Sequence, residues 1–142
     1  MAERLFPIGI QTFEKIRDVN YVYVDKTQQV YRITHGSSMY FFLSRPRRFG
    51  KSLLLSTLES YFEGRRDLFE GLAIAALEKE WKSYPVLHLD LTGTNYHEPD
   101  ALQKTLNLSL IQLEKIYGHG EGEDTLGDRF TGIIKRAKEQ TE

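Results

Sequence analysis

A Gly-Lys-Ser triplet at residues 50–52 constrains this chain most, because of what stands on either side of it. Residues 39–43 form a compact apolar run, too short for a helix, that predicts a buried strand. After the triplet, apolar residues recur at spacings of four and three from Leu54 to Tyr61, which predicts a helix that stops at Gly64. A strand, a tight loop and a helix are therefore expected in succession.

Residues 44–52 contain the parts of a phosphate-binding loop. Such a loop needs inward-facing backbone N–H groups, a helix N-terminus, a lysine for the β and γ phosphates and a hydroxyl for magnesium. Gly50 would let the backbone pass close to a phosphate, Lys51 would reach its oxygens, and Ser52 would ligate Mg²⁺. On residues and context alone, the alternative is an exposed basic turn that begins a helix.

An arginine stands where the generic pattern G-x-x-x-x-G-K-[ST] has its first glycine. This is Arg45, and its side chain is expected to point away from a nucleotide. Arg47 and Arg48 suit bidentate contact with phosphate, and the alternative is that they are solvated or paired with acidic side chains. Together with Phe49, they complete the candidate nucleotide-binding residues 47–52.

The other segments alternate between strand and helix patterns. Further strands are predicted at residues 20–24 and 86–91. Helices are predicted over residues 25–33, over residues 99–117 and over a last segment that includes residues 130–137. Strands that alternate with helices predict an α/β architecture with a parallel sheet.

The amino-acid composition limits the kinds of partner and site that this chain can have. Lys and Arg total 19 against 20 Asp and Glu, so no global basic field exists and any nucleic-acid contact would be local to residues 45–48. The absence of cysteine excludes a disulfide framework and a thiolate metal site. Because no apolar run is long enough for a signal peptide or a membrane span, a cytoplasmic chain without membrane contact is expected.

Three other residues are candidates for a role at the site. Asp90 ends an apolar run and would hold Mg²⁺ through water near Ser52, or else serve as a structural, loop-orienting carboxylate. Asp25 is expected to cap a helix, with a role beside the nucleotide as the alternative. Trp81 is expected to pack in the core rather than to stack on bases.

The run at residues 42–56, Phe-Leu-Ser-Arg-Pro-Arg-Arg-Phe-Gly-Lys-Ser-Leu-Leu-Leu-Ser, resembles the Walker A segment of the predicted AAA-ATPase-like family. These bacterial proteins often carry a nuclease-like domain of the PD-(D/E)XK type further on. Other stretches similar to the family are residues 7–10, 23–27, 61–64, 68–72 and 84–91. An arginine at position 45 is usual there. The resemblance implies a P-loop ATPase of the AAA and STAND-like group, in which Lys51 and Ser52 bind ATP and Mg²⁺.

The resemblance also implies a missing segment. In the family, a helix like the last one predicted here leads into the Walker B strand, which positions magnesium and the attacking water. This sequence stops before such a strand. We therefore expect residues 1–142 to be the N-terminal portion of a single P-loop NTPase-type domain, a parallel sheet with flanking helices that is truncated before the Walker B strand. It would bind ATP and would not hydrolyse it alone.

Two alternative functions stay open at this point. One is a non-enzymatic interaction domain, in which the loop persists as a vestigial element of the fold and binds nothing. The other is a nucleic-acid-binding module that uses the arginines of residues 45–48. The oligomeric state and the cellular process do not follow from the sequence.

Overall fold

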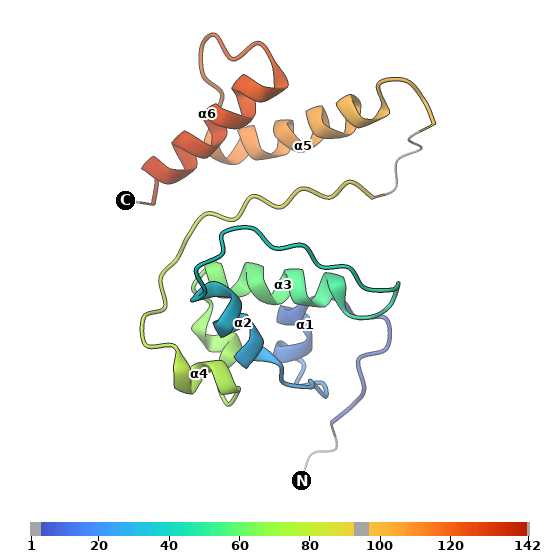
Figure 1. Cartoon of the computed structure of the whole chain (residues 1–142), viewed down its shortest axis with the longest axis vertical. Helices are drawn as coiled ribbons and strands as arrows, with labels where there is room; N and C mark the ends of the chain where they lie inside the picture. The colour runs from blue at the N-terminus through green and yellow to red at the C-terminus, as the bar shows by residue number, and fades with distance from the viewer. Residues whose placement is uncertain (1–3, 93–96, 142) are drawn as a thin grey trace. The chain divides into compact units, whose positions relative to one another are not determined.

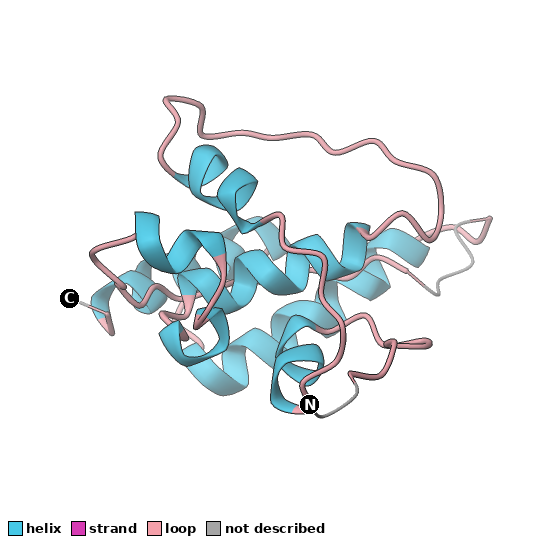
Figure 2. Ribbon diagram, turned by 90° about the horizontal axis from the view of Figure 1, so that it is seen from below, coloured by secondary structure: helices cyan, strands magenta, loops and turns pink. Residues whose placement is uncertain are grey.

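The computed structural model describes residues 4–92 and 97–141, and within these ranges the secondary structure is helical (Figures 1 and 2). The elements are α1 (Phe13–Asp18), α2 (Thr27–Thr34), α3 (Lys51–Phe62), the 3-10 helix η1 (Arg66–Phe69), α4 (Ala73–Leu77), α5 (Ala101–Tyr117) and α6 (Leu126–Glu139). The chain divides into an N-terminal unit that ends at Tyr84 and a C-terminal unit that begins at Pro85. Each unit is described by itself.

The prediction of a parallel sheet is wrong. No strand is found in the described ranges, and the segments predicted as strands are extended without a ladder of hydrogen bonds. Residues 39–43 are exposed, with Tyr40 at 92% and Phe42 at 94% of their full accessible surface. In residues 20–24, Val22 N–H donates to Leu5 O at 2.9 Å, which is a single bond between two extended segments. A strand requires a paired neighbour, and an apolar run of the right length does not supply one.

The helices predicted from long apolar periodicities are confirmed. α3 begins at Lys51 and ends at Phe62, two residues before Gly64, whose positive φ of 73° stops the helix. α5 ends at Tyr117 and is followed by Gly118, as predicted, and α6 covers the last predicted segment. None of the described helices is both long and apolar enough to span a membrane.

The core of the N-terminal unit is aromatic and lies between short helices. Phe13 of α1 and Phe69 of η1 are fully buried, and their ring centroids lie 4.8 Å apart. Val30, Leu68 and Ile74 complete the buried cluster. α1, η1 and α4 were not predicted, because they have only six, four and five residues and show too few turns for a helical period to be visible.

Asp25 and Thr27 join the start of α2 to the start of α4. Asp25 Oδ1 accepts hydrogen bonds from Thr27 N–H at 2.8 Å and Thr27 Oγ1 at 2.7 Å, so Asp25 holds the first residue of α2 as a cap would, although the N-cap position is Lys26 and no capping box is formed within the described residues. The other oxygen of Asp25 accepts from Ala73 N–H at 2.7 Å, and Thr27 Oγ1 accepts from Ile74 N–H at 3.1 Å. Two residues at one helix start therefore also accept from N–H groups of another helix, 47 and 48 residues further along the chain.

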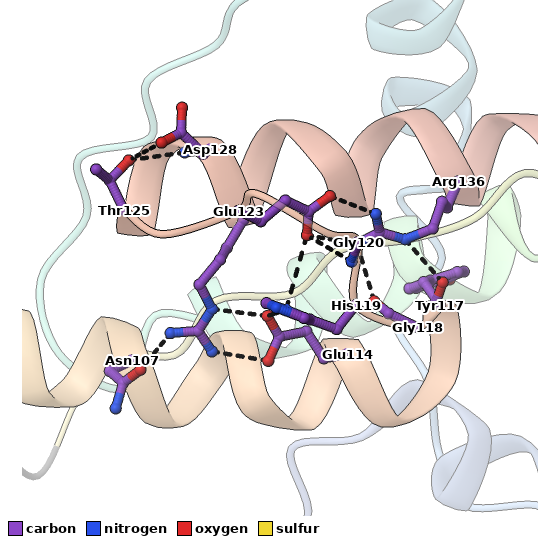
Figure 3. A network of polar contacts seen from close by, with 11 residues as sticks. Asn107, Glu114, Tyr117, Gly118, His119, Gly120, Glu123, Thr125, Asp128 and Arg136 are labelled. Atoms are coloured by element: carbon purple, nitrogen blue, oxygen red, sulfur yellow. Dashed lines mark hydrogen bonds and ion pairs between the residues drawn. The ribbon is translucent and has the colours of Figure 1, made fainter.

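The C-terminal unit is a pair of parallel helices joined by a loop that runs back along them. Figure 3 shows α5 and α6 running in the same direction, with residues 118–125 returning between their ends. Leu110 and Leu113 of α5 pack with the fully buried Ile133 of α6. Gly132 leaves room for the carboxylate of Glu123, which a Cβ at this position would displace.

Candidate functional site

The loop at residues 44–50 leads directly into α3, and every residue from 44 to 52 is exposed. Two of its residues have left-handed backbone conformations: Arg48 has a φ of 66° and Gly50 a φ of 75°. A glycine adopts this conformation without strain, whereas an arginine does so at a cost of about 1–2 kcal/mol. No atom lies within 4 Å of where a Cβ of Gly50 would be, so its backbone faces open space.

The N-terminus of α3 has no cap. Its first intrahelical bond runs from Leu54 N–H to Gly50 O at 2.9 Å, which leaves the N–H groups of residues 51–53 without an acceptor inside the helix. Gly50 has no side chain to accept them. Among the described residues, no acceptor is found for the backbone N–H groups of residues 47–53. Several N–H donors and the positive end of the helix dipole therefore face solvent together.

Lys51 folds back across this loop. Its Nζ donates to the carbonyl oxygen of Arg45 at 2.7 Å, so the ammonium connects the first helical residue to the start of the loop. An ammonium has three donors, and this bond uses one of them. The remaining donors lie on an exposed side chain. Ser52, the second residue of α3, is exposed on the same helical turn.

The loop carries a concentration of positive charge without acidic partners. In the described part of the chain, no carboxylate lies within salt-bridge distance of Arg45, Arg47, Arg48 or Lys51. The alternative in which Arg47 and Arg48 are paired with acidic side chains is therefore not realised in this structure. Phe49, which follows Arg48 in the loop, is 63% exposed. Such a cluster attracts an anion.

Asp90 holds a turn together. Its Oδ1 accepts a hydrogen bond from Thr92 N–H at 2.9 Å, and this bond lowers the pKa of the carboxyl below its ordinary value. The carboxylate thus has the loop-orienting contact that was one of its two predicted roles. Asp90 belongs to the C-terminal unit and Ser52 to the N-terminal unit, so a shared magnesium stays a prediction.

The other predicted candidates have structural contacts. Trp81 packs on Phe69, with ring centroids 5.1 Å apart, and on Tyr61 at 5.7 Å, as expected for a core residue. Partial burial alone would raise the pKa of Asp25, but the hydrogen bonds from Thr27 and Ala73 outweigh it and lower that pKa. A nucleotide-side role of Asp25 would compete with both of these bonds.

The C-terminal unit contains a cluster that sequence reasoning missed, formed by Glu114, His119 and Glu123 (Figure 3). Their nearest ligand atoms lie within 4.8 Å of one another. However, Glu114 accepts two hydrogen bonds from Arg129 at 2.7 Å, which lower its pKa to about 2, and Glu123 is paired with Arg136 at 2.5 Å. A metal ion would have to displace both arginines, so the cluster is an ion-pair network. No local sequence signal indicates this cluster, because Glu114 lies on α5, His119 and Glu123 lie in the following loop, and the two arginines lie on α6.

Comparisons with known proteins add the family. The chain is 37% identical over 138 residues to a protein of Azotobacter chroococcum mcd 1 described as "Uncharacterized protein in vnfD 5'region", a match that covers 96% of this chain. This chain spans 27% of that protein's length. No solved structure matches the chain. The sequence profile of the family described as "Predicted AAA-ATPase" matches residues 7–142, and the chain belongs to this family.

Proposed function

We propose that this chain binds ATP with Mg²⁺ through a Walker A-like loop at residues 44–52. The observation that carries the proposal is the uncapped N-terminus of α3, with the ammonium of Lys51 folded over it onto the carbonyl of Arg45. A helix start without a protein cap, beside a lysine and without a neighbouring carboxylate, suits a phosphate group. Membership in the predicted AAA-ATPase family supports a nucleotide over other phosphate ligands.

Each part of the loop has a role in this proposal. The N–H groups of residues 50–52 would donate to phosphate oxygens, and the positive φ of Gly50 exposes them. Lys51 would exchange its bond to Arg45 O for a charge-assisted bond to the β and γ oxygens. Ser52 would ligate Mg²⁺ with its hydroxyl, and Arg47 and Arg48 would contact the outer phosphate oxygens.

Binding, rather than turnover, is the proposed activity of these 142 residues. Hydrolysis requires a carboxylate that orients magnesium and a group that positions water, in addition to the phosphate grip. Lys51 and Ser52 supply the grip, while Asp90 already accepts a bond from Thr92. Because the chain spans 27% of its relative's length, attack of water on the γ phosphate and a downstream nuclease-like domain are proposals for the larger protein.

The test is titration with a fluorescent ATP analogue, with and without Mg²⁺, on wild type, Lys51→Ala and Lys15→Ala. Lys15 is an exposed lysine of the same unit and is the matched control. Loss of a charge-assisted bond weakens binding by about ten- to a hundredfold. We expect that loss for Lys51→Ala, no change for Lys15→Ala, and weaker binding of the wild type without Mg²⁺. Equal affinities of all three proteins would contradict the proposal.

A nucleic-acid-binding module is the second candidate, because the three loop arginines have no acidic partners in the described structure. It predicts binding to single-stranded DNA that falls steeply with salt and that Arg47→Ala with Arg48→Ala removes. ATP binding that DNA does not displace would favour the nucleotide function. A vestigial loop would bind neither ligand.

A further inference from the structure

A groove at the opposite end of α3 from the loop is a second candidate site in the N-terminal unit. It has a volume of about 470 Å³ and lies between the C-terminal ends of α2 and α3 and the segment at residues 77–84. This volume lies within the range of small-ligand sites. None of the loop residues 44–52 lines it.

The walls of the groove are aromatic. The rings of Tyr31 and His35 are stacked, with centroids 3.9 Å apart. Tyr61 and Trp81 meet edge to face at 5.7 Å and form another wall. The faces of such rings attract cations, most strongly where water is partly excluded.

A buried carboxylate lies among these rings. The side chain of Glu78 is only 6% exposed. Its Oε2 accepts a hydrogen bond from Tyr61 OH at 2.5 Å, and its Oε1 accepts from Glu80 N–H at 3.0 Å. Both donors are neutral. Among the described residues, no lysine or arginine lies within salt-bridge distance of Glu78. Lys82, which also lines the groove, is paired with Glu80 at 2.9 Å.

Among the described residues, His35 is the basic side chain within salt-bridge distance of this carboxylate, and it is charged only when protonated. Its Nε2 lies 3.4 Å from Glu78 Oε2, and its side chain is 42% exposed. Its Nδ1 lies 3.1 Å from the carbonyl oxygen of Tyr31, which can only accept a hydrogen bond. In the neutral tautomer that satisfies this carbonyl, the Nε2 lone pair faces the carboxylate and gives it no charge compensation.

Glu78 stays ionised at neutral pH. Burial alone would raise the pKa of its carboxyl, but the hydrogen bonds from Tyr61 and from the Glu80 N–H outweigh burial and lower it. Conversely, burial and the bond to Glu78 raise the pKa of Tyr61 to about 12, so the phenol keeps its proton and remains a donor. The groove therefore holds a negative charge that lacks a permanent positive partner, and a buried charge is stabilised by pairing.

We propose that this groove binds the guanidinium group of arginine, with Glu78 as its anionic partner and the rings of Tyr31, Tyr61 and Trp81 as its walls. A guanidinium stacks on aromatic faces and is more weakly hydrated than an ammonium, so it enters a half-open aromatic groove at a smaller desolvation cost. Its N–H groups reach the lone pairs of Glu78 that Tyr61 and Glu80 leave free. The same chemistry is offered by free arginine and by an arginine side chain of another protein.

Trp81 makes the test direct, because it is the single tryptophan of the chain and it lines the groove. Its fluorescence is followed while wild-type protein is titrated with N-acetyl-arginine amide and, in parallel, with N-acetyl-citrulline amide, which has the same shape and no charge. We expect a saturable change with the arginine derivative and at least tenfold weaker binding of citrulline. Equal response to both, or no saturable change with arginine, would overturn the proposal. Since these arms use wild-type protein alone, they decide the question even if a variant fails to fold.

Variants identify the anionic partner. Glu78→Gln keeps the size of the side chain and removes its charge, and Glu70→Gln, which removes an exposed carboxylate of the same unit outside the groove, is the control. We expect at least tenfold weaker arginine binding for Glu78→Gln, provided that near-ultraviolet circular dichroism shows a folded protein, and less than twofold change for Glu70→Gln. A folded Glu78→Gln protein that binds as wild type does would refute the role of Glu78.

Two further measurements identify the source of the guanidinium group and distinguish this groove from the loop at residues 44–52. Free arginine that binds more tightly than the capped derivative identifies a small molecule, and the reverse order identifies a side chain of a partner protein; both orders support the guanidinium site. Lys51→Ala should bind the arginine derivative as wild type does, because the loop lies at the other end of α3. The test of the guanidinium site is therefore independent of the test of nucleotide binding.

Discussion

The starts of α4 and α3 show two ways of treating the N–H groups at a helix N-terminus. At α4, Asp25 accepts from Ala73, Thr27 accepts from Ile74, and the carbonyl of Leu72 accepts from the third N–H. At α3, the corresponding N–H groups of residues 51–53 have no acceptor among the described residues. Both helices belong to the same unit, and the side-chain acceptors at α4 come from residues 47 and 48 positions earlier in the chain.

At α4 the first N–H groups serve the fold, whereas at α3 the first N–H groups are available to a ligand. The α4 start is tied by side chains from a distant segment, which stabilises the fold and leaves no donor free. The α3 start combines open donors with Lys51 and with strained backbone at Arg48. Backbone strain and N–H groups without an acceptor both destabilise the folded state, and they are typical of ligand-binding positions.

The largest expected effect comes from removing the cap of α4. Asp25→Ala would remove the acceptor for Thr27 and Ala73, at the starts of two helices. Each lost cap costs about 0.5–2 kcal/mol, so we expect the free energy of unfolding to fall by about 2–3 kcal/mol. Urea denaturation measures this change. Asp18→Ala, at an exposed carboxylate of α1, should stay within about 0.5 kcal/mol of wild type. Equal stability of the two variants would refute the account of the α4 start.

The contribution of Asp25 should also depend on pH. Its pKa is lowered in the folded protein, so its ionised form is stabilised by folding. The stabilisation is fully present above the ordinary carboxyl pKa of about 3.9 and is lost as the pH falls through the lower folded value. The stability difference between wild type and Asp25→Asn should therefore be constant above about pH 5 and shrink below about pH 4. A difference that grows on acidification would contradict the sign of this argument.

The smallest expected effect is at the α3 start. Arg48→Gly would relieve the left-handed backbone, whose cost of about 1–2 kcal/mol is partly offset by the greater freedom of glycine in the unfolded chain. We expect a stabilisation of up to about 1 kcal/mol in thermal unfolding. Arg47→Gly is the matched control, because Arg47 has no positive φ, and it should stabilise nothing. A destabilised Arg48→Gly protein would mean that the arginine side chain contributes to the fold.

Sequence periodicity predicted those helices that are long enough to show it. α3 and α5 have 12 and 17 residues, and a glycine follows each within two positions. The five-residue α4 has no such period, and its caps come from residues 47 and 48 positions earlier, a distance that no local pattern spans. The sheet was predicted from apolar runs such as residues 39–43, and pairing, which defines a strand, depends on other segments rather than on the run itself.

The candidate site was only partly predictable, because sequence patterns show local features and not contacts between distant segments. The loop and Lys51 are local, so the sequence identified them, and the contact of Asp25 with the start of its own helix is also local. The groove at Glu78 was missed, because its walls come from three separate segments. A buried glutamate and an exposed one look alike in a sequence.

The most direct test of the central claim compares both helix starts in one experiment. Uniformly ¹⁵N-labelled protein is titrated with a non-hydrolysable ATP analogue and Mg²⁺, and the backbone amide signals are followed by nuclear magnetic resonance. If the open start of α3 holds the phosphates, the signals of Lys51 and Ser52 shift in a saturable way, while those of Ala73 and Ile74 stay unchanged because their N–H groups already have acceptors. Saturating nucleotide that leaves Lys51 and Ser52 unshifted, or that shifts both helix starts equally, would contradict the account.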